Sequence, residues 1–83
     1  MRISFHPDVL KRLQRLPRAE LETALQVVIA LSHDPRPVSA KKLVGSKRDW
    51  RVRVGQYRVV YSIDDATIEV TVFNMAKRSD AYR

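Results

Sequence analysis

The sequence predicts one α+β domain, over residues 1–83, in which a helix hairpin covers one face of an antiparallel sheet. A short alternating segment opens the chain, two apolar stripes with helical spacing follow it, and three alternating segments separated by short turns complete it. Because 83 residues are enough for only one small hydrophobic core, we expect function to reside on a surface or in a shallow cleft.

The first forty residues predict a strand and two helices. In MRISFH, Ile3 and Phe5 alternate with polar residues, as in a short strand with one buried face. His6 and Pro7 end this strand, and proline suits the first turn of a helix. The first helix has an apolar stripe of Val9, Leu10, Leu13 and Leu16, and the second has one of Leu21, Ala24, Leu25, Val28, Ile29 and Leu31. Pro17 separates the helices, and the two prolines of HDPRPVS end the second one.

The segment DWRVRVGQYRVVY, residues 49–61, predicts a β-hairpin with a two-residue type II′ turn at Gly55 and Gln56. Counting outward from this turn gives the pairs Val54 with Tyr57, Arg53 with Arg58, Val52 with Val59, and Arg51 with Val60. Side chains alternate between the two faces of a strand. One face therefore carries Trp50, Val52, Val54, Tyr57, Val59 and Tyr61, and the other carries Arg51, Arg53 and Arg58.

A third strand of the meander is predicted in TIEVTVFNM, residues 67–75, after a turn near Asp64 to Ala66. Uninterrupted alternation would place Ile68, Val70 and Val72 on the helix-facing side. It would place Glu69, Thr71, Phe73 and Met75 with the arginines, and Glu69 would lie across from Ser62. The basic segment AKRSDAYR ends the chain.

Positive charge is concentrated in one part of the chain. The formal net charge is +7, and residues 41–58 contain seven basic residues, with Asp49 as the only acid. These basic residues are Lys41, Lys42, Lys47, Arg48, Arg51, Arg53 and Arg58. Such a concentration predicts a polyanionic partner, either a nucleic acid or an acidic protein.

The composition excludes several kinds of chemistry. Without cysteine there is neither a disulfide nor a thiolate metal site, and the chain has no glycine-rich phosphate loop. His6 and His33 lie at predicted element ends, where a helix-boundary role is favoured over metal ligation. Any catalysis must therefore use Arg, Lys, Tyr, Asp or Glu, and we expect no cofactor and no metal. The lack of a long apolar run predicts a soluble, cytoplasmic protein.

The arginine face and the aromatic residues each have a structural alternative. Arginines on a sheet face are often only solvated, but three of them without a nearby carboxylate favour anion binding. Trp50, Tyr57 and Tyr61 could stack on bases, yet their position in the alternation favours a role in the core. Tyr82 lies next to the last residue, where a frayed end is an equal alternative to a functional role.

The order of the elements, the motif GQYRVVY and the terminal KRSDAYR together resemble the RelE branch of the RelE/ParE toxin superfamily, over essentially the whole chain. The resemblance implies a two-layer RelE-like microbial ribonuclease fold. It also implies a toxin of a type II toxin-antitoxin system that cleaves messenger RNA in the ribosomal A site and so inhibits translation. A co-encoded antitoxin, acidic where it contacts the arginines, would hold the toxin inactive in a hetero-oligomer.

By the same resemblance, the catalytic residues would be Arg51, Arg53, Arg58, Lys77, Arg78 and Tyr82. Lys41, Lys42, Lys47 and Arg48 would contact RNA or the ribosome. Well-studied family members have lysines at the positions of Arg51 and Arg53, and this substitution makes proton transfer harder because arginine does not readily deprotonate.

RNA can be cleaved without a metal when the 2′-hydroxyl attacks the adjacent phosphorus. The reaction needs a base for the 2′ proton, cations for the phosphorane charge and an acid for the leaving oxygen. Arg58 with Arg53 is the expected phosphate clamp, and Tyr82 is the expected base or base-stacking residue. Two alternatives remain: a ParE-like inhibitor of DNA gyrase without catalysis, and an RNA-binding module that holds phosphates without cutting.

Overall fold

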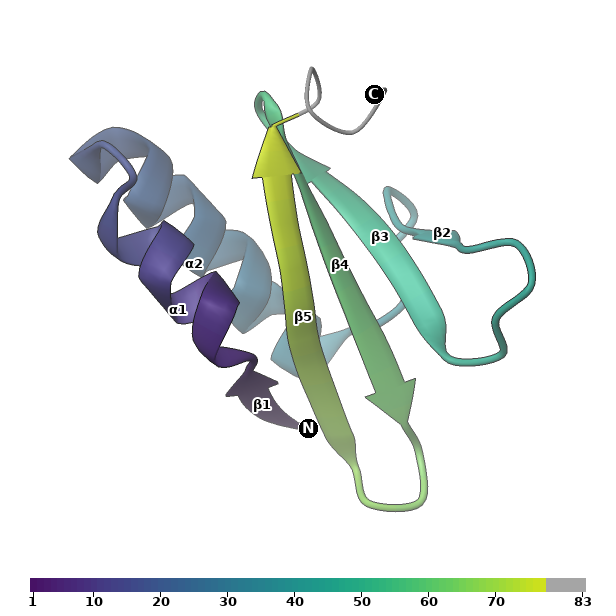
Figure 1. Cartoon of the computed structure of the whole chain (residues 1–83). Coiled ribbons are helices and arrows are strands. Elements are labelled where there is room, and N and C mark those ends of the chain that lie inside the picture. The colour runs from purple at the N-terminus through teal and green to yellow at the C-terminus, as the bar shows by residue number, and fades with distance from the viewer. Residues whose placement is uncertain (78–83) are drawn as a thin grey trace.

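The computed structural model describes residues 1–77 and confirms the α+β class with helices on one face of the sheet (Figure 1). The elements are β1 (Arg2–Phe5), α1 (Pro7–Gln14), α2 (Arg18–His33), β2 (Lys41–Lys42), β3 (Asp49–Val54), β4 (Tyr57–Asp64) and β5 (Glu69–Lys77). The five strands lie in the order β1-β5-β4-β3-β2. Within the described part of the chain, no helix is long and apolar enough to cross a membrane.

Two features of the sheet differ from the predicted one. The strand β1 pairs with β5 in parallel, so the sheet is mixed instead of fully antiparallel. A parallel pair needs a long crossover connection, and the helix hairpin and the meander together supply it. The strand β2 was not predicted because two residues are too short to produce an alternating pattern. It pairs with β3, where it covers part of that strand's edge.

The helix boundaries follow the local sequence. His6 caps α1, and its Nδ1 atom accepts a hydrogen bond from the backbone N–H of Asp8 at 3.1 Å. Pro7 is the first helical residue, which costs nothing because the first N–H groups of a helix have no partner within it. The second helix follows Pro17 and ends at His33. Both histidines are therefore helix-boundary residues, as predicted.

The core lies between the helices and the sheet. The helices contribute buried Val9, Leu13, Ala24, Val28 and Leu31, and the sheet contributes Val52, Val54, Val59, Tyr61, Ile63, Val70, Val72 and Met75. Trp50 and Tyr57 are partly buried against this cluster. The prediction that the aromatic residues of the hairpin belong to the core is confirmed.

A β-bulge interrupts β5 and overturns the predicted position of Met75. Val60 pairs with Asn74 but Tyr61 pairs with Val72, so Phe73 has no partner in the register. The extra residue shifts the alternation by one position. Met75 is therefore buried in the core at 2% exposure, while Phe73 is 36% exposed.

The turn before β5 also differs from the prediction. Ile68 was expected in the core, but it is 58% exposed and has a positive φ of 55°. Glu69 lies opposite Asp64 instead of Ser62, whose partner is Thr71. The Oδ1 atom of Asp64 accepts hydrogen bonds from two backbone N–H groups of the turn, which fixes this longer connection.

Tyr61 joins the segment after α2 to the sheet. Its side chain is fully buried, and its hydroxyl donates a hydrogen bond to the carbonyl oxygen of Pro35 at 2.7 Å. Arg36, which follows Pro35, forms an ion pair with Asp65 at 2.8 Å, and its Cζ atom lies 5.7 Å from the ring centroid of Trp50. Burial is the main reason why the pKa of Tyr61 rises to about 12, opposed by the charge of Arg36.

The bulge predicts that Met75→Ala costs more stability than Phe73→Ala. Truncating the buried methionine should lower the free energy of unfolding by about 2–5 kcal/mol because it leaves a cavity in the core. Truncating the half-exposed phenylalanine removes less buried surface and should cost less. Chemical denaturation of the two variants and the wild type measures the difference. The reverse order would mean that β5 alternates without a bulge.

The raised pKa of Tyr61 predicts a loss of stability at high pH. The folded-state pKa of about 12 exceeds the ordinary value of 10.0, so the folded protein holds the phenol proton more tightly than the unfolded chain does. This contribution is complete below pH 10.0 and disappears as the pH rises toward about 12. Denaturation curves across this range should decline less steeply for Tyr61→Phe than for the wild type. Equal slopes would contradict the assignment.

Candidate nucleic-acid interface

The β3–β4 hairpin brings three arginines onto the face of the sheet opposite the helices. Arg53 pairs with Arg58 and Arg51 pairs with Val60, as predicted from the turn. Gly55 permits this turn because it has a φ of 57°, a conformation that side chains disfavour. We call the side chains of Lys41, Arg51, Arg53 and Arg58 the arginine face.

Lys41 belongs to this surface because β2 pairs with β3. Lys41 lies opposite Arg51, whereas Lys42 lies opposite Trp50 and therefore points to the other side of the sheet. The two adjacent lysines, which the sequence placed in one group, are thus separated by the register. Lys47 is exposed in the connection between β2 and β3.

The arginine face is open enough to be reached by a ligand. Arg53 is exposed, and Arg51 and Arg58 are half-buried. Between them Val60 is only 8% exposed, although it lies on the face away from the helices. Among residues 1–77, neither Arg51 nor Arg53 forms an ion pair with a carboxylate. Their charge is therefore available to an anion.

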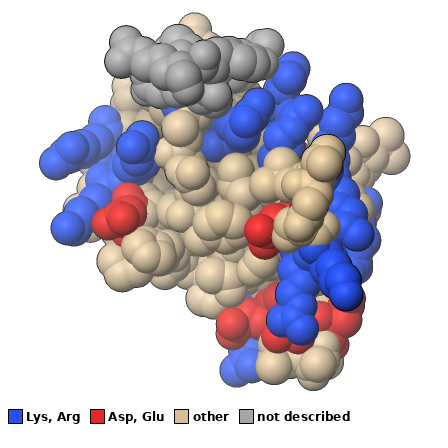
Figure 2. Space-filling model, turned by 45° about the vertical axis from the view of Figure 1, so that its right-hand side comes forward, with Lys and Arg blue, Asp and Glu red and all other residues tan. Residues whose placement is uncertain are grey.

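Acidic residues lie at the opposite end of the sheet, where basic side chains already neutralise them. Arg48 contacts Asp64 at 3.5 Å, and Arg2 contacts Glu69 at 4.0 Å. Figure 2 shows the result: Asp and Glu at the bottom of the molecule are mixed with Lys and Arg, while Lys and Arg predominate above. Arg48, expected to contact RNA or the ribosome, pairs with Asp64 and is distant from the Gly55 turn, and its role in binding stays a prediction.

Of the other predicted catalytic residues, the structure describes Lys77, which is not part of this face. Lys77, the last residue of β5, pairs with Tyr57 and so lies toward the helix side, whereas Ala76 is the residue opposite Arg58. It lines a surface hollow of about 560 Å³ together with Arg12 and Arg15 of α1. Arg78 and Tyr82 lie outside the described residues.

Sequence reasoning did not single out the basic group around Lys77 or the acidic Glu20 beside it. Arg15 and Arg12 have the outward spacing of an ordinary amphipathic helix, and Glu20 has the position of an ordinary first-turn acid. No feature of the sequence distinguishes them from solvated helix residues. Only the packing of α1 and α2 beside β5 brings them together.

The chemistry available on the arginine face is that of anion binding. A guanidinium offers planar, paired donors that match phosphate oxygens, and it stays charged at any physiological pH. Among the described residues, no group of three or more His, Asp or Glu side chains could hold a metal ion. The face can therefore hold a phosphate and stabilise negative charge.

Comparisons with known proteins agree with this fold. A family model described as the ParE toxin of the type II toxin-antitoxin system parDE matches residues 3–82. The chain therefore belongs to the RelE/ParE superfamily of type II toxin-antitoxin toxins. A protein of Methanocaldococcus jannaschii named as toxin RelE1 is 33% identical over 86 residues, which cover 98% of this chain and 93% of the relative.

Solved structures give the same relationship. The archaeal RelE–RelB complex from Pyrococcus horikoshii OT3 contains a chain that superposes with a TM-score of 0.84 at 30% identity, covering 93% of both chains. The isolated RelE toxin of E. coli superposes with a TM-score of 0.82 at 25% identity, covering 98% of this chain and 89% of that one. The predicted RelE-like fold is confirmed.

Proposed function

We propose that this toxin is a ribosome-dependent endoribonuclease that cleaves messenger RNA in the A site and so inhibits translation. The observation that supports this most is the grouping of Arg51, Arg53 and Arg58 on an open face, beside the lysine of β2. Like charges directly opposite each other destabilise a hairpin, so a chain that keeps Arg53 opposite Arg58 has reason to hold them for an anion. An RNA phosphate is such an anion.

The proposed reaction is attack of a 2′-hydroxyl on the adjacent phosphorus. The new P–O bond gives a 2′,3′-cyclic phosphate, the bond to the 5′ oxygen breaks, and the leaving oxygen takes a proton to become a 5′-hydroxyl. Arg58 and Arg53 would clamp the nonbridging oxygens and stabilise the phosphorane, with Arg51 beside them. The reaction requires neither a metal nor another cofactor.

Proton transfer needs groups other than the arginines, because a guanidinium does not readily deprotonate. Within the described residues, Lys41 is the titratable side chain that shares the arginine face. By resemblance to the family, Tyr82 is the further candidate as base or stacking residue, and Lys77 and Arg78 would add positive charge. Lys42, Lys47 and Arg48 would contact the ribosome from outside the cleavage site.

The second candidate function is ParE-like inhibition of DNA gyrase without catalysis. The matching family model carries the ParE name, which favours this alternative, while the similar solved structures are RelE toxins. Purified protein incubated with programmed ribosomes, followed by mapping of the new 5′ ends on the message, separates the two. Intact message together with inhibited DNA supercoiling would favour the gyrase alternative.

We also propose that a co-encoded antitoxin binds the toxin in a hetero-oligomer in the cytoplasm, where the ribosomes are. The Pyrococcus horikoshii relative was solved as a RelE–RelB complex, which supports a partner of this kind. An acidic segment laid across the arginine face would compete directly with RNA for the same cations. High expression of the toxin alone, without any effect on growth, would count against this partner.

Arg58→Ala should lower the single-turnover rate of message cleavage on programmed ribosomes about 100-fold or more, because one stabiliser of the transition-state charge is lost. Arg18→Ala is the matched control, since it removes the same charge from an exposed site on α2, where the described structure pairs it with Glu22. Thermal melts establish that both variants are folded. Equal cleavage by wild type and Arg58→Ala would eliminate the phosphate clamp.

The register of β2 predicts different roles for the adjacent lysines. Lys41→Ala should slow cleavage about tenfold or more because it removes the titratable group of the arginine face. Lys42→Ala removes the same charge on the opposite side of the sheet and should change the cleavage rate less. Lys41→Arg keeps the positive charge but cannot readily transfer a proton. A cleavage rate like that of the wild type would therefore assign the effect of Lys41 to its charge, and a rate like that of Lys41→Ala would assign it to proton transfer. Equal losses for Lys41→Ala and Lys42→Ala would mean that both act only as general positive charge.

A further inference from the structure

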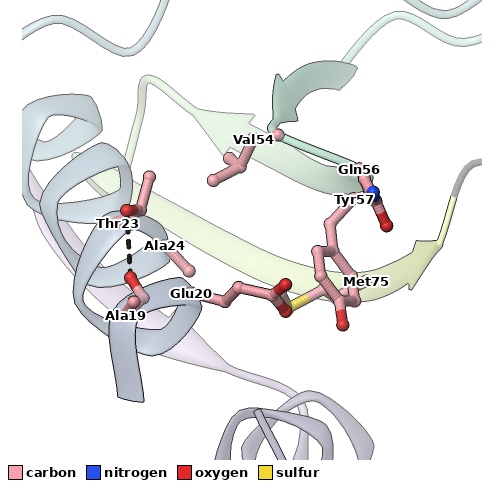
Figure 3. A pocket seen from close by; sticks show the side chains of 9 residues that line it. Ala19, Glu20, Thr23, Ala24, Val54, Gln56, Tyr57 and Met75 are labelled. Carbon is pink, nitrogen blue, oxygen red and sulfur yellow. Dashed lines mark hydrogen bonds between the residues drawn. The ribbon is translucent and has the colours of Figure 1, made fainter. Parts of the chain in front are cut away.

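A small hollow lies between the first turn of α2 and the β3–β4 hairpin, on the side of the sheet away from the arginine face. It has a volume of about 240 Å³, and its walls are mainly apolar (Figure 3). The lining residues include Ala19, Ala24, Val54, Tyr57 and Met75, with Glu20 as the acidic side chain among them. Ligand sites for small molecules usually measure about 300–1,000 Å³, so this space suits a single side chain better.

Glu20 brings a carboxylate into this apolar hollow, and one of its oxygens has no hydrogen-bond partner in the described structure. Its side chain reaches from α2 toward Tyr57 and Met75 (Figure 3). Within the described structure, its Oε2 atom is buried and has no hydrogen-bond partner. A carboxylate that loses contact with water needs a donor or a cation in exchange. Burial, followed by hydrogen bonding and repulsion from Glu20, raises the pKa of Tyr57, so the phenol stays neutral beside the carboxylate.

We propose that this hollow binds the side chain of one arginine or lysine from a protein partner of the toxin. The methylene groups would lie against Val54 and Met75, and the cationic end would meet the Glu20 carboxylate and the face of the Tyr57 ring. Within the smaller hollow the charged lining group is the Glu20 carboxylate, which attracts a cation and offers a phosphate no donor. This inference rests on the proposed function in that the partner is the co-encoded antitoxin proposed above. Binding at the hollow does not itself require ribonuclease activity.

The surroundings of Glu20 define the partner further. The larger hollow that contains Arg12, Arg15 and Lys77 also reaches Glu20 and Tyr57. In the part of the chain that the structure describes, none of these three cations forms an ion pair with Glu20. They line the larger hollow, which shares Glu20, Tyr57 and Met75 with the smaller one. A complementary partner segment would therefore carry one basic side chain flanked by acidic ones.

The test uses nuclear magnetic resonance of the full chain with two small probes. N-acetylarginine methylamide carries the cation, and N-acetylcitrulline methylamide has nearly the same shape without the charge. The arginine probe should shift the methyl signals of Met75 and Ala24 and the ring signals of Tyr57, with a Kd on the order of millimolar. The citrulline probe should bind about tenfold more weakly or not at all. Equal shifts with both probes, or no shifts, would overturn the proposal.

Variants assign the effect to the hollow. Glu20→Gln keeps the shape and should weaken binding of the arginine probe about tenfold. Glu22→Gln removes an exposed charge two residues away and should leave binding unchanged. Arg78→Gln and Arg83→Gln test whether the chain's own basic residues are the occupant. If the arginine probe bound these two variants but not the wild type, the occupant of the hollow would be a basic residue of this chain and not of a partner, which would overturn the proposal. These binding measurements do not depend on ribonuclease activity, so a failure of the proposed function would leave their result unchanged.

Discussion

The geometry of the β3–β4 hairpin depends on its two-residue turn at Gly55 and Gln56. This turn fixes which residues pair, and the pairing decides which face each side chain occupies. Burying Val52, Val54 and Val59 contributes roughly 1.5–3 kcal/mol each. The repulsion between Arg53 and Arg58 costs at most about 1 kcal/mol. Apolar burial on one face therefore holds the like charges together on the other.

The distribution of charge along the sheet follows from the same register. The acidic residues of β4 and β5 lie away from the Gly55 turn, and ion pairs with Arg48 and Arg2 absorb their charge. The arginine face lies toward the turn, and among residues 1–77 neither Arg51 nor Arg53 pairs with a carboxylate. At physiological salt, exposed charges act over about 8 Å, so these neutralised acids weaken an anion's attraction to the arginines very little. A polyanion is therefore directed to one end of one face.

The sequence predicts well wherever a local rule determines the geometry. The pairing of Arg53 with Arg58 follows from a two-residue turn, and the helix start at Pro7 follows from backbone chemistry. The position of Met75 did not follow, because no residue in TVFNM marks a bulge and uninterrupted alternation is the simplest pattern. The parallel pairing of β1 and the two residues of β2 depend on contacts between distant segments, which no local pattern contains.

The same limit applies to the candidate sites. The arginine face could be predicted because its three arginines belong to one hairpin, whose alternation is visible in the sequence. Lys41 could be predicted only as a basic residue, since its face depends on the register of β2. The chemistry of Glu20 was not visible, because an acid in the first turn of a helix is ordinary and only the packing of α2 against the hairpin buries its oxygen.

The two candidate sites lie on opposite sides of the turn at Gly55 and Gln56. The hollow that contains Glu20 is lined on the hairpin side by Val54, Gly55, Gln56 and Tyr57. The next residues outward from the turn, Arg53 and Arg58, lie on the other side of the sheet. A side chain bound in the hollow therefore contacts the turn that sets the alignment of the two arginines. One partner segment could anchor a basic residue against Glu20 and continue past the turn with acidic residues toward the arginines. The Glu20 carboxylate on one side of the turn and the guanidinium groups on the other would then fix the direction in which the segment lies, because reversing it would place an acidic residue against Glu20 and a basic one against the arginines.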